Sequence, residues 1–472
     1  MKKLVLTRTI ALWMLPLLLS LGAGCASYDD QIRDYRLTHA RGDMAAAMPM
    51  ATELLEDYAE ENTDKNALVA ILEAANTARV GGDILQSQRQ FARAERVYEM
   101  WQQKARISLS REGLSLFTNP ATLPYRGSGS EIIMINIYQA LNTLRLGDIA
   151  GARQPLMRLY THQKQVVTDN AERIAKERET LEGSAHKNAI ASSSNSSTTR
   201  QATQSIMADL PDTRGYELYA NPFAEYLFAF YHLYAGVDAA DREIARTRLN
   251  RALAMAPNNT AVRQDVERLA AGTHLTPSVY LIHETGMAPY LEEFALMLPI
   301  YAGKTFSTVS IALPRQDTDK DYTPFASISG AGQSARAELL CDMDAVITQE
   351  YKNDYPGRLT RAIASATAKA AAAYAANYAA RKSDNGIVQV ATLVTTTAYQ
   401  FATNTADTRS WVTLPKQIGL CRIDLPKDRR VKLNVNGRQV DVDILNDGDV
   451  HVIYLRTMHS NSTATVWQFK VR

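Results

Sequence analysis

The sequence predicts an α+β protein in which an N-terminal solenoid of helical repeats precedes a mixed α/β region and a small C-terminal antiparallel β module. Two observations lead to this prediction. Small and apolar residues recur at helical spacing after Gly-Asp turns up to residue 272, and short runs of β-branched and aromatic residues follow Gly272. The chain has 472 residues, 46% of them hydrophobic and 22% charged, which is typical of two or three globular domains.

Residues 1–24 resemble the signal peptide of a bacterial lipoprotein. A basic start precedes an apolar run from Ile10 to Leu21, and small residues then lead to Cys25. This run of 12 residues is shorter than the ~20 that a helix needs to cross a bilayer, so it predicts an export signal. The resemblance implies that Cys25 is acylated and begins the mature chain. The alternative is ordinary secretion, with cleavage after Ala26.

The residue after the acylated cysteine predicts the address of the protein. Ala26 stands where lipoproteins retained at the inner membrane carry an aspartate, so the resemblance implies a lipid anchor in the outer membrane, at its periplasmic face. Without residues 1–24 the chain has a formal charge of −1, which does not favour nucleic acid as a partner. We therefore expect two kinds of partner: the membrane, through the anchor, and other envelope proteins.

Two further cysteines allow two interpretations. Cys341 and Cys421 form an even pair in a compartment where disulfides persist. A bond between them would close a loop of 80 residues and contribute roughly 4 kcal/mol to stability. The alternative is two buried thiols, since a free cysteine behaves as a small apolar residue.

Helical hairpins are expected between residues 25 and 272. A Gly-Asp pair occurs at Gly42, Gly82 and Gly147, and small or apolar residues follow each glycine at offsets of about five, nine and twelve. Glycine accepts the left-handed conformation that ends one helix, and aspartate caps the next. A looser fourth copy surrounds Gly236. These hairpins resemble degenerate tetratricopeptide repeats, whose stacking implies a solenoid with a partner-binding concave face. The alternative is an irregular helical bundle that binds nothing.

One long segment interrupts these hairpins. Arg153 to Glu182 reads as a single charged helix. Residues from about 183 to 212 are mostly polar and small, so we expect a disordered insertion there. Asn221 and Pro222 then restart the helical layer with an N-cap and a first-turn proline.

Residues 273–412 are expected to form a mixed α+β domain. The composition after Gly272 predicts three strands, from Val279 to His283, Phe306 to Leu313 and Phe325 to Ser329. Two helices are expected to follow, from Pro356 to Lys382 and from Gly386 to Thr403.

Residues 413–472 are expected to form a β-sandwich-like module. Apolar residues alternate from Val431 to Val435 and again from Val440 to Ile444, on either side of Asn436-Gly437, which is a strong hairpin signal. Two further strands are expected from Val450 to Leu455 and from Ala464 to Val471.

Four motifs spread over the chain carry a second resemblance. They are Tyr125-Arg126-Gly127 with Glu131, Glu284-Thr285-Gly286-Met287-Ala288-Pro289, Gly357-Arg358-Leu359-Thr360-Arg361-Ala362-Ile363, and Asp407-Thr408-Arg409-Ser410-Trp411 with Leu414-Pro415. With them the chain resembles a family of uncharacterised bacterial lipoproteins with helical repeats, associated with gene neighbourhoods that encode a lipoprotein activator of a peptidoglycan synthase. The resemblance implies an envelope location and no known reaction.

The sequence predicts no catalytic residue, no metal-ligand set and no cofactor. Gly303-Lys304-Thr305 imitates the end of a phosphate-binding loop, but Leu298 stands where its first glycine belongs. His283-Glu284 lacks the second histidine of a zinc-protease helix, because Met287 occupies that place.

The sequence therefore favours a non-enzymatic adaptor or scaffold of the cell envelope, with a possible link to peptidoglycan synthesis that rests on the family resemblance alone. The alternative is a small-ligand-binding protein or an enzyme with a site between Glu284 and Asp344, where Gln333 and Arg336 stand among glycines and aspartates. A third class is a structural subunit of a ring or fibre. The sequence predicts no oligomeric state.

Overall fold

A computed structural model describes residues 28–108, 120–184, 186–214, 216, 220–302, 305–382 and 405–472. It confirms an α+β protein with helices in the N-terminal part and sheets in the C-terminal part. The predicted signal peptide, Cys25 and the predicted helix from Gly386 to Thr403 lie outside the described residues. Among the residues described, no helix is both long and apolar enough to cross a membrane.

The N-terminal part is a row of antiparallel helices. Neighbours along the chain contact each other from α2 to α7 and from α10 to α12. Their bounds are α2 (Tyr28–Ala40), α3 (Met44–Ala59), α4 (Ala67–Gly81), α5 (Ile84–Ser108), α6 (Gly129–Arg145), α7 (Arg153–Glu182), α10 (Pro222–Tyr234), α11 (Ala239–Met255) and α12 (Thr260–Ala271). The predicted long helix and the predicted N-cap Asn221 are both confirmed.

The predicted Gly-Asp turns form three of the hairpins. Gly42, Gly82 and Gly147 adopt left-handed backbone angles, with φ of 76°, 95° and 82°. Asp43 and Asp83 each accept a backbone N–H from the first turn of the next helix, whereas Asp148 accepts that of Gly151 in the turn before α7 and does not cap the helix. The small and apolar residues that follow these turns are fully buried, as predicted, at Ala47, Ala51, Leu54, Ser87, Phe91, Ala94, Ala152, Leu156 and Leu159. At Gly236 the backbone is not left-handed, and Asp238 caps α11 instead.

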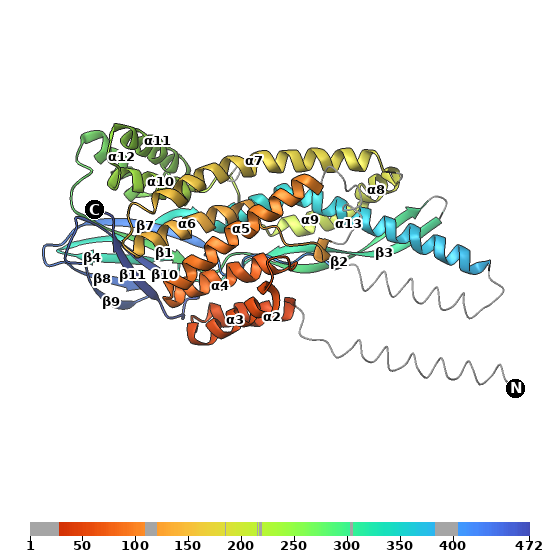
Figure 1. Ribbon diagram of the computed structural model, residues 1–472, viewed down its shortest axis with the longest axis horizontal. Coiled ribbons are helices and arrows are strands. Elements are labelled where there is room, and N and C mark those ends of the chain that lie inside the picture. Colours follow the sequence, from red (N-terminus) through yellow and green to blue (C-terminus); the bar gives the residue numbers. More distant parts are fainter. Residues whose placement is uncertain are drawn as a thin grey trace.

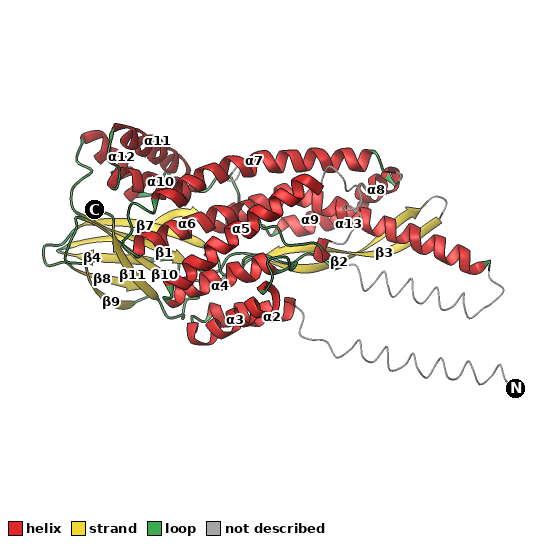
Figure 2. Cartoon of the chain, viewed as in Figure 1, coloured by secondary structure: helices red, strands yellow, loops and turns green. Residues whose placement is uncertain are grey.

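The inner face of this helical layer is covered by the C-terminal half of the same chain. Helices α4, α6 and α10 are buried along nearly their whole length, because outer helices cover one side and strands or α13 cover the other. Figures 1 and 2 show the two larger sheets at one end of the molecule, with α10 to α12 beside them and α7 reaching toward the other end. The face that a solenoid would offer to a partner is therefore occupied.

A five-stranded sheet lies under the helices. Its strand order is β11-β10-β1-β7-β6, and all of its strand pairs are antiparallel except β1 with β10. The bounds are β1 (Ser278–Thr285), β6 (Glu338–Asp342), β7 (Gln417–Asp424), β10 (Val450–Thr457) and β11 (Thr465–Lys470). Because β1 is buried at every residue, it needs neighbours on both sides, and both come from beyond residue 412. Strands from both sides of the predicted domain boundary at residue 412 thus build one sheet.

A four-stranded sheet in the order β5-β4-β8-β9 packs against the first through a shared apolar core. Its strands are β4 (Ala326–Gly330), β5 (Gln333–Arg336), β8 (Arg430–Val435) and β9 (Arg438–Asp443). The predicted hairpin is confirmed, because Asn436 and Gly437 both adopt left-handed angles, with φ of 52° and 82°, between β8 and β9.

A two-stranded ribbon and a long helix extend away from these sheets (Figure 1). Strands β2 (Tyr290–Ala302) and β3 (Thr305–Asp317) pair along their whole length, and α13 (Met343–Arg381) packs on them. The sequence analysis missed β2, whose glutamates and proline obscure its pattern. The predicted helix from Pro356 to Lys382 begins too late, because α13 starts at Met343 after the N-cap Asp342 and contains Pro356 in its interior.

The expected disordered insertion is ordered. Two helices, α8 (Lys187–Ser194) and α9 (Ser197–Ala208), lie in the segment 183–212. Ile190 and Ile206 are 4% and 2% exposed and join an apolar cluster with β3 and α13. The prediction is wrong because it counted only the segment's own polar residues, while the ribbon and α13 supply the apolar surface on which it folds.

The predicted disulfide is absent. Cys341 and Cys421 are both free and buried, and they lie in different apolar cores. Cys341 on β6 contacts Asn221 and Met343 under the helices, whereas Cys421 on β7 lies between the two sheets. The alternative interpretation, two buried thiols, therefore holds.

Candidate functional site

Four segments that are far apart in the sequence meet around one cleft of about 390 Å³. They are the loop 120–131 before α6, one face of α7 from Val166 to Thr180, one face of α13 from Ile347 to Lys369, and the segment 405–414. Strands β2 and β3 form an apolar wall. The lining residues on α7 and α13 recur every three or four positions, so each helix presents one continuous side to the cleft.

Three of the motifs that carry the family resemblance contribute several residues each to this cleft, and the fourth contributes its last residue, Pro289. Residues from each of the four motifs line it, namely Tyr125, Arg126, Gly127, Glu131, Pro289, Arg358, Arg361, Ala362, Asp407, Arg409, Ser410, Trp411 and Leu414. Nothing in the sequence indicates that these residues are neighbours. Their convergence makes the cleft the candidate functional site.

The segment from Glu284 to Asp344, in which the alternative site was expected, does not form the cleft by itself. That segment supplies only one wall of the cleft, mainly through β2 and β3. Gln333 lies on β5 and hydrogen-bonds Asp424, and Arg336 stacks on the ring of Phe325 at 3.3 Å. Both side chains therefore have structural contacts outside the cleft.

Carboxylates fix the start of α6 at one end of the cleft. Glu350 on α13 accepts the backbone N–H groups of Gly129 and Ser130 at 2.6 and 3.0 Å, which are among the donors that the first turn of a helix leaves unpaired. Burial raises the pKa of Glu350 to about 7, and hydrogen bonds from Ser130 and Gly129 oppose that rise. The contact ties α6 to α13.

Glu131 and Arg409 are two of the residues that hold the segment 405–414 in place. Glu131 accepts hydrogen bonds from the Tyr125 hydroxyl at 2.6 Å and from the Trp411 backbone N–H at 2.9 Å. Arg409, only 7% exposed, pairs with Asp407 at 2.7 Å and donates to three backbone carbonyls, those of Lys65, Pro120 and Leu123. These contacts make the segment a fixed rim of the cleft.

Two ion pairs join α7 to α13 along the cleft. Arg173 lies 2.5 Å from Asp354, and Arg361 contacts Glu177. A side chain at Gly357 would place its Cβ 3.0 Å from the Glu177 carboxylate, so glycine allows this close approach. The glycine of the Gly357-Arg358 motif thus has a structural role.

The cleft lining, as far as the structure describes it, contains no histidine and no cysteine. A serine nucleophile there would lack its usual histidine base. The loop from Gly127 to Ser130 instead ends in a helix cap, because Ser128 accepts the N–H of Glu131 while Glu131 accepts that of Ser128. Ser128 and Glu131 are therefore engaged in capping α6.

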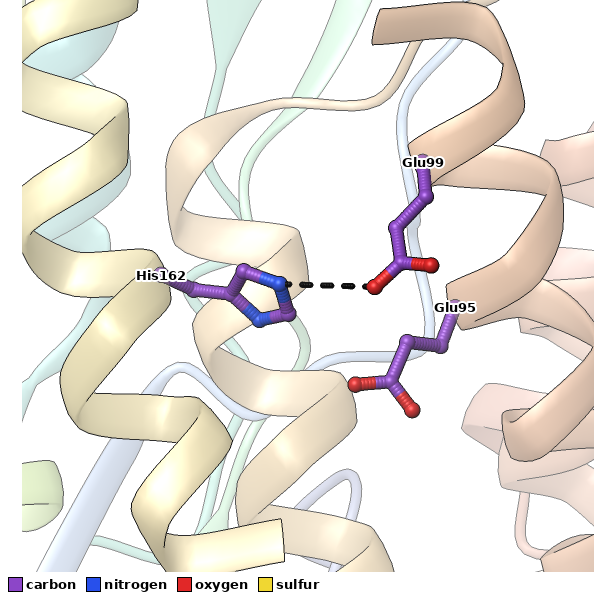
Figure 3. Close-up of side chains that lie close together, drawn as sticks. All are labelled: Glu95, Glu99 and His162. Atoms are coloured by element: carbon purple, nitrogen blue, oxygen red, sulfur yellow. Dashed lines mark ion pairs between the residues drawn. The ribbon is translucent and has the colours of Figure 1, made fainter. Parts of the chain in front are cut away.

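A second cluster of polar side chains, which the sequence analysis missed, lies between α5 and α7 (Figure 3). His162 faces Glu99 at 3.8 Å, and Glu95 lies beside them. The Glu95 carboxylate already accepts hydrogen bonds from the side chains of Arg158 at 2.7 Å and Asn136 at 2.8 Å. Because the guanidinium of Arg158 supplies the positive charge, we interpret the cluster as an ion-pair network. The spacing of four between the two glutamates is its one sequence signal.

Comparison with protein-family models, with curated proteins and with solved structures finds no match to this chain. The geometry and chemistry of the cleft are therefore the basis for a functional proposal.

Proposed function

We propose that the protein is a lipoprotein of the outer membrane, anchored through Cys25 at the periplasmic face, that binds a small ligand in the cleft. The observation that carries the proposal is the convergence of four distant motifs on one cleft of about 390 Å³. Ligand pockets commonly have volumes of about 300–1,000 Å³, with mostly apolar walls and a few polar groups. The cleft combines the β2–β3 wall with charged faces of α7 and α13 in this way.

The contacts around the cleft support a binding role because they make the cleft a preformed site. Glu350 fixes α6 against α13, Arg409 fixes the rim, and the Arg173–Asp354 pair fixes α7 against α13. The side chains of a preformed site are already ordered, so ligand binding costs less conformational entropy. The affinity is higher for this reason.

The position of the chain start supports the proposed anchor. Thr408 on the rim donates a hydrogen bond to Asp29 at 2.8 Å, and Tyr28 is the first described residue. Cys25 precedes Tyr28 by three residues, which span at most about 10 Å. An acyl anchor on Cys25 would therefore hold the rim of the cleft close to the membrane surface.

Native mass spectrometry of the lipidated protein, released gently from its own membrane, tests the proposal. We expect a non-covalently bound mass that is lost in Ala362→Phe, because the new ring would fill the cleft. Ala379→Phe, at an exposed position of the same helix, is the matched control and should retain that mass. Wild-type protein without any bound mass, or an Ala362→Phe variant that keeps it, would contradict the proposal.

An adaptor function is the second candidate, with the helical layer as a degenerate tetratricopeptide-like solenoid. The C-terminal half covers the inner face of that layer, so a protein partner would have to bind elsewhere. Tyr374 and Tyr378 favour such a surface, because they stack on each other on α13 and are 51% and 53% exposed. A partner in peptidoglycan synthesis remains a proposal from the family resemblance.

Photo-crosslinking in living cells tests the adaptor function. A crosslinker at Tyr374 should capture a specific envelope protein, whereas one at the exposed Arg263 on α12 should not. Identical patterns from both positions would contradict the adaptor function.

A further inference from the structure

We infer that the cleft binds an anionic amphiphile, with its charged head between α7 and α13 and a single acyl chain along the β2–β3 wall. This inference rests on the proposed ligand-binding function and specifies its ligand. Three observations support it. Two cations of the cleft lack ion pairs while most of its carboxylates have partners, one wall is apolar, and two buried polar atoms lack hydrogen-bond partners.

The cleft contains two cations that have no partner. Within the part of the chain that the structure describes, the side chains of Lys176 and Arg358 form no ion pair and no hydrogen bond. Both are half-buried, and both stand beside the contact between α7 and α13, next to Glu177 and Gly357 in sequence. Arg358 acts on the Glu131 carboxylate only through the longer-range attraction of their charges. A half-buried cation without a direct ion pair is a favourable place for an anionic ligand.

Most carboxylates of the cleft, in contrast, already have partners, and among the described residues the exposed Glu172 is the exception, with one negative charge against the two positive charges of Lys176 and Arg358. Glu131 and Glu350 accept backbone N–H groups, and Glu177, Asp354 and Asp407 pair with arginines. The charge left over for a ligand is therefore positive, and this selects an anion over a cation.

The wall opposite these cations is apolar. Leu291 on β2 and Ile311, Ala312 and Pro314 on β3 line it. Val166 on α7 and Ile347 on α13 extend the apolar surface toward the two helices. Each methylene group that leaves water for such a surface contributes about 0.8 kcal/mol, so a hydrocarbon chain fits this wall better than a sugar or a nucleotide does.

Two residues that line the cleft also carry a buried polar atom without a partner. The Ser365 hydroxyl and the Gln316 carbonyl belong to side chains that are 4% and 7% exposed, and neither atom has a hydrogen-bond partner in the protein. Ser365 stands seven residues after Arg358, on the same face of α13. Buried polar atoms of this kind are normally hydrogen-bonded, so hydroxyl groups on the ligand would satisfy them.

Two sources can supply this chemistry. A fatty carboxylate has the acyl chain and the charge alone, whereas a lysophospholipid such as lysophosphatidylglycerol adds hydroxyl groups. The hydrogen bond between Thr408 and Asp29 keeps the rim near the anchored chain start, where either source would be available.

Photolabelling of the full-length lipidated protein in phosphatidylcholine nanodiscs tests the inference. The probe is a 12-carbon carboxylate with a diazirine in its chain, and the labelled residues are mapped by mass spectrometry. We expect labels on β2, β3 and α13 around the cleft, and at least five-fold less labelling in the double variant Lys176→Gln with Arg358→Gln. The control double variant, Arg178→Gln with Arg381→Gln, removes exposed cations from the same helices and should label as the wild type does.

Unlabelled competitors separate the possible ligands. Laurate and lauroyl lysophosphatidylglycerol should both suppress labelling, and the stronger competitor identifies the source. 1-Lauroylglycerol lacks the anion and should not compete. Equal competition by 1-lauroylglycerol, or no effect of the Lys176 and Arg358 substitutions, would overturn the inference. A bound mass of other chemistry in the native spectrum would overturn it too, while leaving the ligand-binding function intact.

Discussion

The Arg79 guanidinium lies 2.5 Å from the Glu284 carboxylate, and both side chains are buried between the helical layer and the central sheet. The Tyr138 hydroxyl donates to the same carboxylate at 2.8 Å. Burial alone would raise the pKa of Glu284, but the charges of Arg79 and Arg456 outweigh it and hold the pKa below its ordinary value. The helical layer and the sheet are thus joined by a buried ion pair, across 205 residues of sequence.

Arg79→Met should therefore destabilise the whole body. Glu284 would keep a buried charge without its closest partner, and breaking a buried pair in this way costs about 3–5 kcal/mol. Urea unfolding followed by circular dichroism measures the loss. Arg33→Met removes an exposed arginine with comparable partners, Asp30 and Asp34, and should leave the unfolding midpoint unchanged. Equal midpoints for the wild type and Arg79→Met would contradict the structural role of the pair.

The stability of the protein should fall as the pH rises from about 5 to 8. Burial raises the pKa of Glu73 from 4.5 to about 8, against hydrogen bonds from Thr413 and Val412. The folded state therefore binds a proton that the unfolded state releases near pH 4.5, and this contribution is lost as the pH passes 8. We expect a lower urea midpoint at pH 8.5 than at pH 5.5. Glu73→Gln should reduce this difference, and an unchanged pH dependence in that variant would exclude Glu73 as its source.

Glu350→Ala should loosen the first turn of α6. The substitution leaves the buried N–H groups of Gly129 and Ser130 without an acceptor, at a cost of about 1–3 kcal/mol. Hydrogen exchange read by mass spectrometry should become faster at the start of α6 and remain unchanged in α11. Unaltered exchange at Gly129 and Ser130 would show that another group, such as water, replaces the carboxylate.

The order of α8 and α9 can be tested by proteolysis. Arg200 lies on α9, and we expect trypsin to cut there slowly in the wild type because the helix is docked through Ile206. Ile206→Ser removes that apolar contact and should speed cleavage several-fold. Rapid cleavage at Arg200 in the wild-type protein would instead favour the disordered insertion that the composition suggests.

Local signals in the sequence predicted local structure well. Gly82 with Asp83 marks a helix end and the next helix start, and Asn436-Gly437 requires left-handed angles that a hairpin supplies. Such signals act within a few residues, so they identify helices, turns and hairpins without knowledge of the rest of the chain.

Relationships between distant segments could not be predicted in this way. The neighbours of β1 are β7 and β10, which begin at Gln417 and Val450. The sequence of β1 itself does not indicate which strands it pairs with. The cleft has the same origin, because Lys176 and Arg358 look like ordinary surface cations until α7 and α13 are placed together. Each of the four motifs is unspecific alone, and only the fold brings them together.

The most direct measurement is a high-resolution density map of the lipidated protein taken from its own membrane. We expect one continuous, elongated density in the cleft that contacts Arg358 and lies along Leu291 and Ile311. A cleft that contains only separate water molecules, with both Arg358 and Lys176 solvated, would contradict it.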